Sequence, residues 1–128
     1  MRVLLDSHAL LWAVDQPSQL STSAGGILQD PSHELLVSAG SIWEIAIKVR
    51  LKKLTLALPY KQWMHTALAD LSATVLPISV DYVDLLTTLP FHHRDPFDRL
   101  IVAQAIVEQI PIVSGDPALD AYGIQRLW

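Results

Sequence analysis

The chain has 128 residues, half of them apolar and none of them cysteine, and its formal net charge is −4. This length fits a single domain covering residues 1–128, and the composition excludes disulfides and thiolate metal sites. No apolar run approaches the length of about 18 residues that suggests a membrane-spanning helix, and no signal-peptide pattern follows Met1. We therefore predict a cytoplasmic protein with no membrane partner.

Short apolar runs alternate with helical patterns along the whole chain. In chain order, the predicted strands span residues 2–5, 35–37, 74–78, 110–113 and 124–127. The predicted helices span residues 7–14, 21 or 23 to 28, 41–52, 60–71, 80–87 and 96–109, and a short helical turn follows Asp116-Pro117. Strands that alternate with helices form βαβ units, so the pattern predicts an α/β fold around a mainly parallel sheet, with the last strand at an edge.

Four carboxylates occupy places where a strand gives way to a helix or a helix begins. Asp6 follows an apolar strand, Glu44 lies near the start of an apolar helix, Asp98 lies in the first turn of another, and Asp116 follows Ile112–Gly115. In a parallel sheet such places line up along the carboxyl edge of the strands, where ligands bind. Crowded carboxylates repel one another, so they hold a proton or a cation. Oxygen ligands of this kind suit a hard divalent cation.

Each acid also has an explanation as part of a helix terminus. Asp6 or Ser7 is able to cap the first helix. Ser41 and Glu44 have the spacing of a capping box, and Glu44 is four residues before Lys48, which is typical of a helix ion pair. The surroundings of Glu44 favour more than capping, because its helix is apolar nearly all round and a buried charge needs a partner.

The two Asp-Pro pairs also have an explanation as helix caps. Asp95-Pro96 and Asp116-Pro117 each place an N-cap before a proline at the first helical position. Asp98 is then a first-turn acid that faces the helix dipole. Capping and metal binding are compatible within one site, so both interpretations stay open for these acids.

Four motifs in order closely resemble PIN-domain nucleases, and most of all the VapC-type toxins of bacterial type II toxin–antitoxin operons. They are Val-Leu-Leu-Asp-Ser-His-Ala-Leu-Leu-Trp, Ser-Ala-Gly-Ser-Ile-Trp-Glu-Ile-Ala-Ile-Lys, His-Arg-Asp-Pro-Phe-Asp-Arg-Leu-Ile-Val-Ala-Gln-Ala and Ile-Val-Ser-Gly-Asp-Pro. The resemblance runs from Val3 to Trp128. It implies a single PIN domain with a three-layer α/β/α sandwich, and an endoribonuclease that depends on Mg²⁺ or Mn²⁺. It also implies an RNA substrate, a cognate VapB-type antitoxin and a homodimer.

By position, the family's four acids fall on Asp6, Glu44, Asp98 and Asp116, which the resemblance makes catalytic residues and metal ligands. Asp95 is the second choice to Asp98 for the third place. Many relatives have Asn where this chain has Asp116, so this position is expected to tune the site more than to hold the metal. No protein nucleophile is needed, because a metal ion is able to supply the attacking water and neutralise the phosphate.

Side chains near these acids are candidates for contacts with RNA. Ser7 and Ser114 lie beside two of the acids and are expected to orient waters or ligands, or to act only as cap and strand-end hydroxyls. Arg94 and Arg99 flank Asp98 and are expected to hold a phosphate. A further basic cluster ends the helix predicted over 41–52 and also complements its dipole. Its members are Lys48, Arg50, Lys52 and Lys53.

The remaining predictions concern the locations of aromatic and apolar residues. His92 and His93 are expected on the surface, because an oxygen-rich site for a hard metal does not call for imidazole, whereas His8 could line the cleft. Trp12 and Trp43 are assigned to the core or an interface. A segment rich in large side chains is expected to form the antitoxin groove or the dimer face. It comprises Leu56, Leu58, Tyr60, Trp63 and Met64.

Two other classes of protein are alternatives to a PIN nuclease. Magnesium-dependent α/β proteins of the haloacid dehalogenase or receiver type fit poorly, since the former want a second Asp where this chain has His8 and the latter want a Lys after a later strand. A catalytically silent PIN-like module that only binds RNA or protein remains the alternative, because a fold does not by itself imply a catalytic function.

Overall fold

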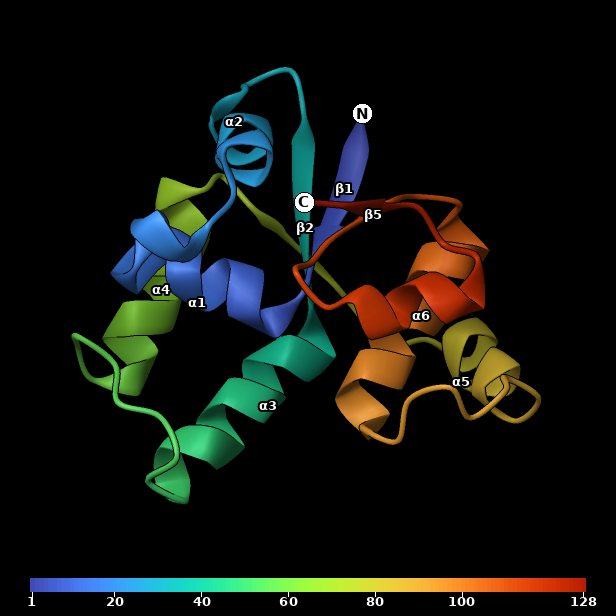
Figure 1. Cartoon of the computed structure of the whole chain (residues 1–128). Helices are drawn as coiled ribbons and strands as arrows, with labels where there is room; N and C mark the ends of the chain where they lie inside the picture. Colours follow the sequence, from blue (N-terminus) through green and yellow to red (C-terminus); the bar gives the residue numbers. More distant parts are fainter.

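The computed structural model describes residues 1–128 and has a five-stranded parallel sheet at its centre (Figure 1). The strands are β1 (Arg2–Leu5), β2 (Glu34–Ser38), β3 (Thr74–Leu76), β4 (Ile112–Val113) and β5 (Arg126–Leu127), in the order β3-β2-β1-β4-β5. The α-helices are α1 (Ser7–Asp15), α2 (Thr22–Gln29), α3 (Ala39–Arg50), α4 (Tyr60–Asp70), α5 (Val80–Leu86) and α6 (Pro96–Glu108). Two 3₁₀ helices, η1 (Pro17–Gln19) and η2 (Pro117–Tyr122), complete the chain.

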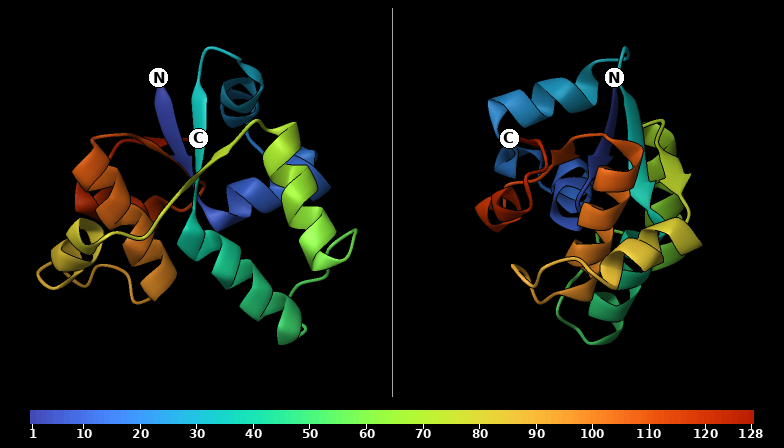
Figure 2. Two further views of the ribbon diagram at one scale, coloured as in Figure 1. Left: turned by 180° about the vertical axis from the view of Figure 1, so that it is seen from behind. Right: turned by 90° about the vertical axis from the view of Figure 1, so that its right-hand side faces the viewer.

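Helices cover both faces of the sheet, as the views in Figures 1 and 2 show, so the predicted α/β/α sandwich is confirmed. Alternate residues of a strand point to opposite faces. Leu4 of β1 therefore packs with α5 and α6, while Val3 and Leu5 pack with α1 and α2. All three side chains are fully buried. β1 lies at the centre of the sheet, which explains why its residues are apolar on both faces.

The parallel register brings the carboxyl ends of β1, β2 and β4 together. Leu5 of β1 pairs with Val37 of β2 and with Val113 of β4. The chain leaves these strands into α1, α3 and η2, and α3 extends beyond the strand ends (Figure 1). Residues that directly follow these strands therefore share one edge of the sheet.

Most predicted elements are confirmed, with shifts of a few residues. The strand predicted over 74–78 ends at Leu76, the strand predicted over 110–113 begins at Ile112, and the helix predicted over 41–52 spans Ala39–Arg50. Helix α3 begins earlier than predicted because the hydroxyl of Ser38 accepts a hydrogen bond from the Gly40 amide and caps it.

The apolar segment expected to form a groove is largely core. Trp63 and Met64 of α4 are 1% and 5% exposed, because they pack against Val37 and Ile45 in the layer between the sheet and α4. The prediction was wrong for these two residues. Of the two alternatives for Trp43, the core is wrong, since the residue is 62% exposed, and the interface stays a prediction. None of the helices has the length and apolar character needed to span a membrane.

Candidate metal centre and active site

Asp6 lies where β1 ends, and it is the N-cap of α1. Its Oδ1 accepts a hydrogen bond of 2.7 Å from the Ala9 amide, so the predicted capping role falls on Asp6 and not on Ser7. The residue is only 6% exposed. Burial raises the pKa of Asp6 above its ordinary value, while hydrogen bonds from the Ser114 hydroxyl and the Ala9 amide partly offset this rise. Asp6 is a buried carboxyl at the carboxyl edge of the sheet.

Glu44 of α3 is 4% exposed and has two partners that hold its two oxygens. The Ser7 hydroxyl donates to Oε1, which ties the start of α1 to α3. Lys48 Nζ lies 2.9 Å from Oε2, so the predicted helix ion pair is confirmed. The capping box predicted from Ser41 and Glu44 is wrong, because Ser38 caps this helix and the buried Ser41 hydroxyl has no hydrogen-bond partner.

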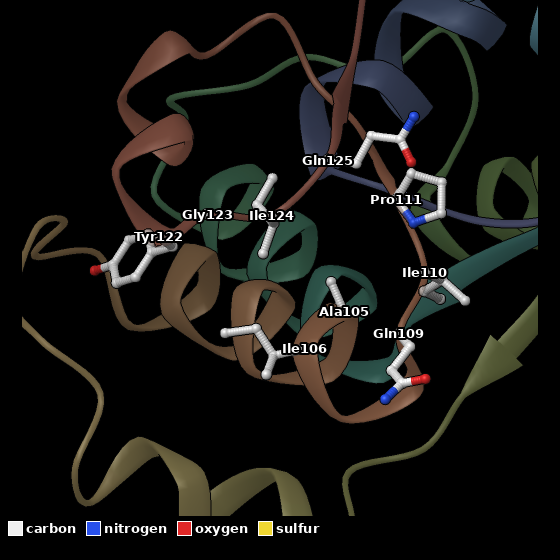
Figure 3. Close-up of a pocket in the computed structure, with 9 residues that line it drawn as sticks. All are labelled: Ala105, Ile106, Gln109, Ile110, Pro111, Tyr122, Gly123, Ile124 and Gln125. Carbon is white, nitrogen blue, oxygen red and sulfur yellow. The ribbon is translucent and has the colours of Figure 1, made fainter.

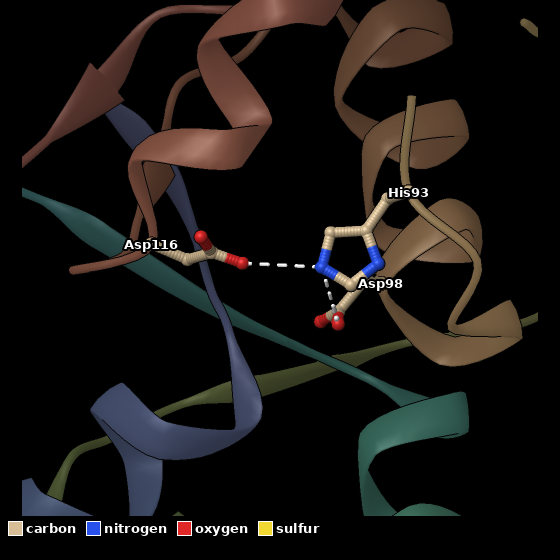
Figure 4. A group of neighbouring side chains, drawn as sticks. All are labelled: His93, Asp98 and Asp116. Carbon is tan, nitrogen blue, oxygen red and sulfur yellow. Dashed lines mark hydrogen bonds and ion pairs between the residues drawn. The ribbon is translucent and has the colours of Figure 1, made fainter. Parts of the chain in front are cut away.

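Asp98 of α6 and Asp116, which follows β4, share one partner, His93 of the loop that precedes α6. The Nε2 atom of His93 lies 3.3 Å from Asp98 Oδ2 and 3.2 Å from Asp116 Oδ2 (Figure 4). One ligand atom from each of the three residues falls within a 4.8 Å span, which is compact enough for one metal ion. The expectation that His93 is a surface residue was therefore wrong.

The ring of His93 is held in one orientation by its neighbours. The Asp95 amide donates to Nδ1 at 3.2 Å, and the His93 amide donates to the Tyr122 hydroxyl at 2.9 Å. A neutral imidazole whose Nδ1 accepts a hydrogen bond carries its proton on Nε2. The Nε2–H group then points at the two carboxylates as a donor, so His93 orients Asp98 and Asp116.

Of the four acids, Asp98 has the pKa that departs most from its ordinary value. Its pKa is raised to about 7, mainly by burial and further by the negative charges of Asp95, Glu44 and Asp6, while His93 opposes the rise. The charges of Glu44 and Asp6 therefore couple to Asp98 electrostatically, while Asp116 is joined to Asp98 through their shared partner His93. Asp95 itself caps α6 by accepting from the Phe97 amide at 2.8 Å, as predicted.

Asp116 and Ser114 follow β4. Asp116 caps η2 by accepting from the Ala118 amide at 3.0 Å, and its own amide donates to the Ser114 hydroxyl at 3.0 Å. The Asp116 side chain is 41% exposed, which makes it the most open of the four acids. Capping and membership of the acidic cluster thus coexist at Asp116, as they do at Asp6.

The two arginines beside Asp98 have different roles. Arg99 is 6% exposed, and its guanidinium donates to the carbonyl oxygens of Leu86, Leu89 and Pro90. The prediction that Arg99 holds a phosphate was wrong, because its donors are used to fasten the loop before α6. Arg94 is exposed and lines an open groove together with Glu44 and Lys48, where a phosphate is able to reach it.

A comparison with protein-family models matches the PIN domain over residues 3–125. The chain belongs to the PIN domain family. Ribonuclease VapC22 of Mycobacterium tuberculosis (strain ATCC 25618 / H37Rv) is 33% identical over 123 residues, which cover 94% of this chain and 91% of VapC22. The resemblance that the four motifs suggest is confirmed by these matches, which extend over nearly the whole chain.

Solved structures share the PIN fold at lower identity. The structure of VapBC2 from Rickettsia felis bound to a promoter DNA fragment matches with a TM-score of 0.70 at 14% identity, covering 98% of this chain and 97% of that one. FitAcB from Neisseria gonorrhoeae matches with a TM-score of 0.60 at 19% identity, covering 97% and 95% of the two chains. VapBC-1 from nontypeable Haemophilus influenzae gives 0.60 at 16% identity, covering 98% and 96%.

A second hollow of this PIN domain lies away from the acids. It has a volume of about 390 Å³ and lies between the C-terminal end of α6 and the segment from Tyr122 to Gln125 (Figure 3). None of its lining side chains is charged, and its polar side chains are those of Gln109, Tyr122 and Gln125. Because Asp98 is at the opposite end of α6, this hollow is separate from the acidic cluster.

Proposed function

We propose that this PIN domain is an endoribonuclease toxin of the VapC type that depends on Mg²⁺ or Mn²⁺. The observation that carries the proposal is the acidic cluster itself: Asp98 feels the charges of Glu44 and Asp6, and it shares a histidine with Asp116. The relationship to Ribonuclease VapC22 supports the same reaction class, hydrolysis of RNA phosphodiester bonds.

The residues of the cluster fit a hard divalent cation. Asp6, Glu44, Asp98 and Asp116 offer only carboxylate oxygens, which Mg²⁺ and Mn²⁺ prefer. Burial is the main cause of the rise in the pKa of Asp98 to about 7, and repulsion from the charges of Asp95, Glu44 and Asp6 adds to it, so this carboxyl group favours a proton or a cation. A cation bound there would remove this repulsion, and it would supply charge neutralisation at the phosphate and an activated attacking water.

The protein's own groups would hold this arrangement in place. Ser7 and Lys48 fix the Glu44 carboxylate, and the Ala9 amide fixes Asp6. His93 orients Asp98 and Asp116, with its tautomer set by the Asp95 amide. Ordering these groups before the substrate arrives lowers the reorganisation that the reaction requires. In this proposal Asp95 acts on Asp98 through its charge and through His93, and Asp98 is the third ligand.

The partners follow from the same relationship. The solved neighbours include VapBC complexes, which supports a cognate VapB-type antitoxin for this chain. We also propose a homodimer and a cytoplasmic location, where RNA is accessible. Exposed apolar side chains are available for such contacts on α3 and α5, including Trp43 at 62% and Val80 at 84% exposure.

Cleavage of single-stranded RNA with Mg²⁺ and with EDTA tests the proposal. The purified chain without antitoxin is expected to cut RNA only with the metal, and Asp6→Asn is expected to abolish cutting. Asp70→Asn is the matched control, because Asp70 is an exposed acid on α4 outside the cluster. Undiminished cleavage by Asp6→Asn would refute the metal mechanism. Absence of cleavage by the wild type, with RNA binding intact, would favour the silent binding module.

Metal binding has a readout that does not depend on activity. A ligand that binds only the folded state raises the melting temperature. Mg²⁺ is therefore expected to raise the melting temperature of the wild type and of Asp70→Asn equally, and that of Asp98→Asn much less. Equal shifts in all three proteins would place Asp98 outside the metal site.

A further inference from the structure

A hollow of about 390 Å³ lies beside the acidic cluster, between α1 and the end of α3. His8 and Trp12 of α1 line it on one side, and Lys48 and Lys53 line it on the other. Lys48 is also the partner of Glu44, with 2.9 Å between Nζ and Oε2. The hollow is therefore one side chain away from a proposed metal ligand.

The α1 side of the hollow is an aromatic wall. The rings of His8 and Trp12 are four residues apart on one helix face, with centroids 5.3 Å apart. Trp128 supports Trp12 from the C-terminus at a centroid distance of 5.8 Å. Trp128 also packs against Gly115, where a Cβ would lie 3.0 Å from the indole. The wall is thus connected to the loop that carries Asp116.

The opposite side of the hollow is basic, because the turn at the end of α3 brings Lys48 and Lys53 together. Lys52 has a positive φ of 57°, and this left-handed residue turns the chain back so that the Lys53 amide donates to the Lys48 carbonyl at 2.9 Å. Lys48 and Lys53 therefore lie together, and both also line the adjoining groove that contains Glu44 and Arg94. Lys53 makes no ion pair within the chain.

One acid, Asp15, also lines the hollow, but both of its oxygens are bound by the scaffold. Oδ1 accepts from the Trp63 indole at 2.9 Å, and Oδ2 accepts from the Ala57 amide at 3.2 Å. Asp15 therefore serves to position α4 and the preceding loop. The basic groups of the hollow differ in their partners: Lys48 is paired with Glu44, and because an ammonium group has three donors it is still able to donate to a second acceptor, whereas Lys53 has no ion-pair partner.

We propose that this hollow is a nucleotide subsite: it receives one base of single-stranded RNA against Trp12, with the flanking phosphates on Lys48 and Lys53. The inference rests on the proposed function, and it adds where the strand lies relative to the acids. Aromatic faces stack on any base and ammonium groups follow the backbone, which is the usual chemistry of single-strand binding. The shared lysines give a continuous path from the hollow to the acidic cluster.

Binding measured in a cleavage-deficient protein tests the subsite. In the Asp6→Asn background with Mg²⁺, the affinity for a short fluorescein-labelled oligouridylate is compared with that for an abasic oligomer of equal length by fluorescence polarisation. Trp12→Ala is expected to weaken binding of the oligouridylate about tenfold, a typical loss for one stacked base, and to leave the abasic oligomer unaffected. Trp12→Phe keeps a ring and should retain most of the affinity.

The lysine is tested separately. Lys53 is exposed, so Lys53→Gln leaves the core intact. It is expected to weaken binding of both oligomers and to reduce the slope of log affinity against log salt concentration by about 1. The matched controls are Lys61→Gln and Phe91→Ala, since Lys61 and Phe91 are exposed and lie outside the hollow. Both controls should bind like the parent protein.

The outcomes separate the two proposals. If the wild type cuts RNA and Trp12→Ala binds both oligomers as tightly as its parent, the nucleotide subsite is refuted and the nuclease stands. If Trp12→Ala weakens antitoxin binding while RNA binding is unchanged, the hollow is a peptide site and the subsite is also refuted. If the wild type neither cuts nor binds RNA, the proposed function itself fails.

Discussion

The four clustered acids form two pairs with different surroundings. Asp6 and Glu44, the inner pair, are 6% and 4% exposed, whereas the side chains of Asp98 and Asp116, the outer pair, are 24% and 41% exposed. The inner pair is bonded to groups on regular elements, such as the Ala9 amide, the Ser7 hydroxyl and the Lys48 ammonium. The outer pair shares one partner, His93, which comes from a loop.

This difference indicates that the two pairs have different roles in binding a metal ion. Fixed donors on α1 and α3 keep the inner pair ordered, because moving either carboxylate would leave buried donors without partners. The outer pair is more exposed and its shared partner His93 lies on a loop, so this pair is able to shift when a cation binds without disturbing the core. We infer that the inner pair defines where a metal ion binds, and that the outer pair adapts to its arrival.

The largest expected effect compares one acid from each pair. Asp6→Asn should lower the rate of RNA cleavage at least about a thousandfold, roughly 4 kcal/mol, because it removes a buried ligand charge. Asn remains a good N-cap, so α1 should stay folded. Asp116→Asn should cost only about ten- to a hundredfold, since the exposed amide oxygen is still a possible ligand. Single-turnover cleavage measures both, and equal losses would contradict the division into two pairs.

Arg99 fastens the loop that carries His93, the shared partner of the outer pair, and its removal should have a large effect on stability. Arg99→Met leaves three loop carbonyl groups without their donor and should lower the free energy of unfolding by about 2–3 kcal/mol, measured by urea denaturation. Arg94→Gln, on the exposed neighbour, should leave the stability unchanged and weaken RNA binding. An Arg99→Met protein that is as stable as the wild type but binds RNA weakly would restore the phosphate role.

Arg99 also shows where sequence reasoning reaches its limit. Arg94 and Arg99 lie on either side of Asp98, four residues before it and one residue after it, and nothing in their identity tells which one is buried. The difference arises because Arg99 lies on the face of α6 that contacts α5, where the carbonyls that end α5 and the loop lack donors. Such contacts depend on how helices pack, and helix packing is not visible in a linear pattern.

The fold and the acids were more accessible to prediction. Leu4 and its neighbours are apolar on both faces of β1, which is a local sign of a central parallel strand. Asp6 and Asp116 follow such strands directly, so topology alone places them at one edge. His93 was missed because it acts from a loop, and loop conformation is set by tertiary bonds such as the one to Tyr122. Its only sequence signal is its position two residues before the Asp95 cap.

His93 should have an intermediate effect on metal binding. His93→Ala leaves Asp98 and Asp116 to repel each other and should weaken Mn²⁺ binding about tenfold, as measured by calorimetry. His93→Gln should recover most of the affinity, because its amide nitrogen donates from nearly the same place as Nε2. The ¹⁵N chemical shifts of the wild-type ring should report a proton on Nε2.

His92→Ala is the control for this experiment, because the His92 ring packs on Tyr122 and contacts neither acid. It should bind Mn²⁺ like the wild type. A rise in Mn²⁺ affinity for His93→Ala would show that the imidazole competes with the cation, and it would contradict the orienting role.

The smallest expected effect is a pH dependence of stability that belongs to the outer pair. The folded chain holds the Asp98 proton up to a pKa of about 7, whereas the unfolded chain releases it near the ordinary value of 3.8. The stability that this proton contributes is complete below the unfolded pKa of 3.8 and is lost progressively as the pH rises from there through about 7. In EDTA, the melting temperature of the wild type should therefore fall by a few degrees more between about pH 5 and pH 8 than that of Asp98→Asn.

Adding the metal ion should reverse this dependence and so connect it to the site. A cation competes with the proton for Asp98, so Mg²⁺ should stabilise the wild type more at about pH 8 than at about pH 5. His93→Gln in the same experiment separates the contribution of the imidazole from that of the carboxyl group, because this variant keeps Asp98 and lacks the imidazole. If Asp98→Asn and the wild type show the same pH dependence in EDTA, then burial and the neighbouring acids do not raise the pKa of Asp98, and the unfavourable charge on Asp98 is not what drives the cluster to bind a cation.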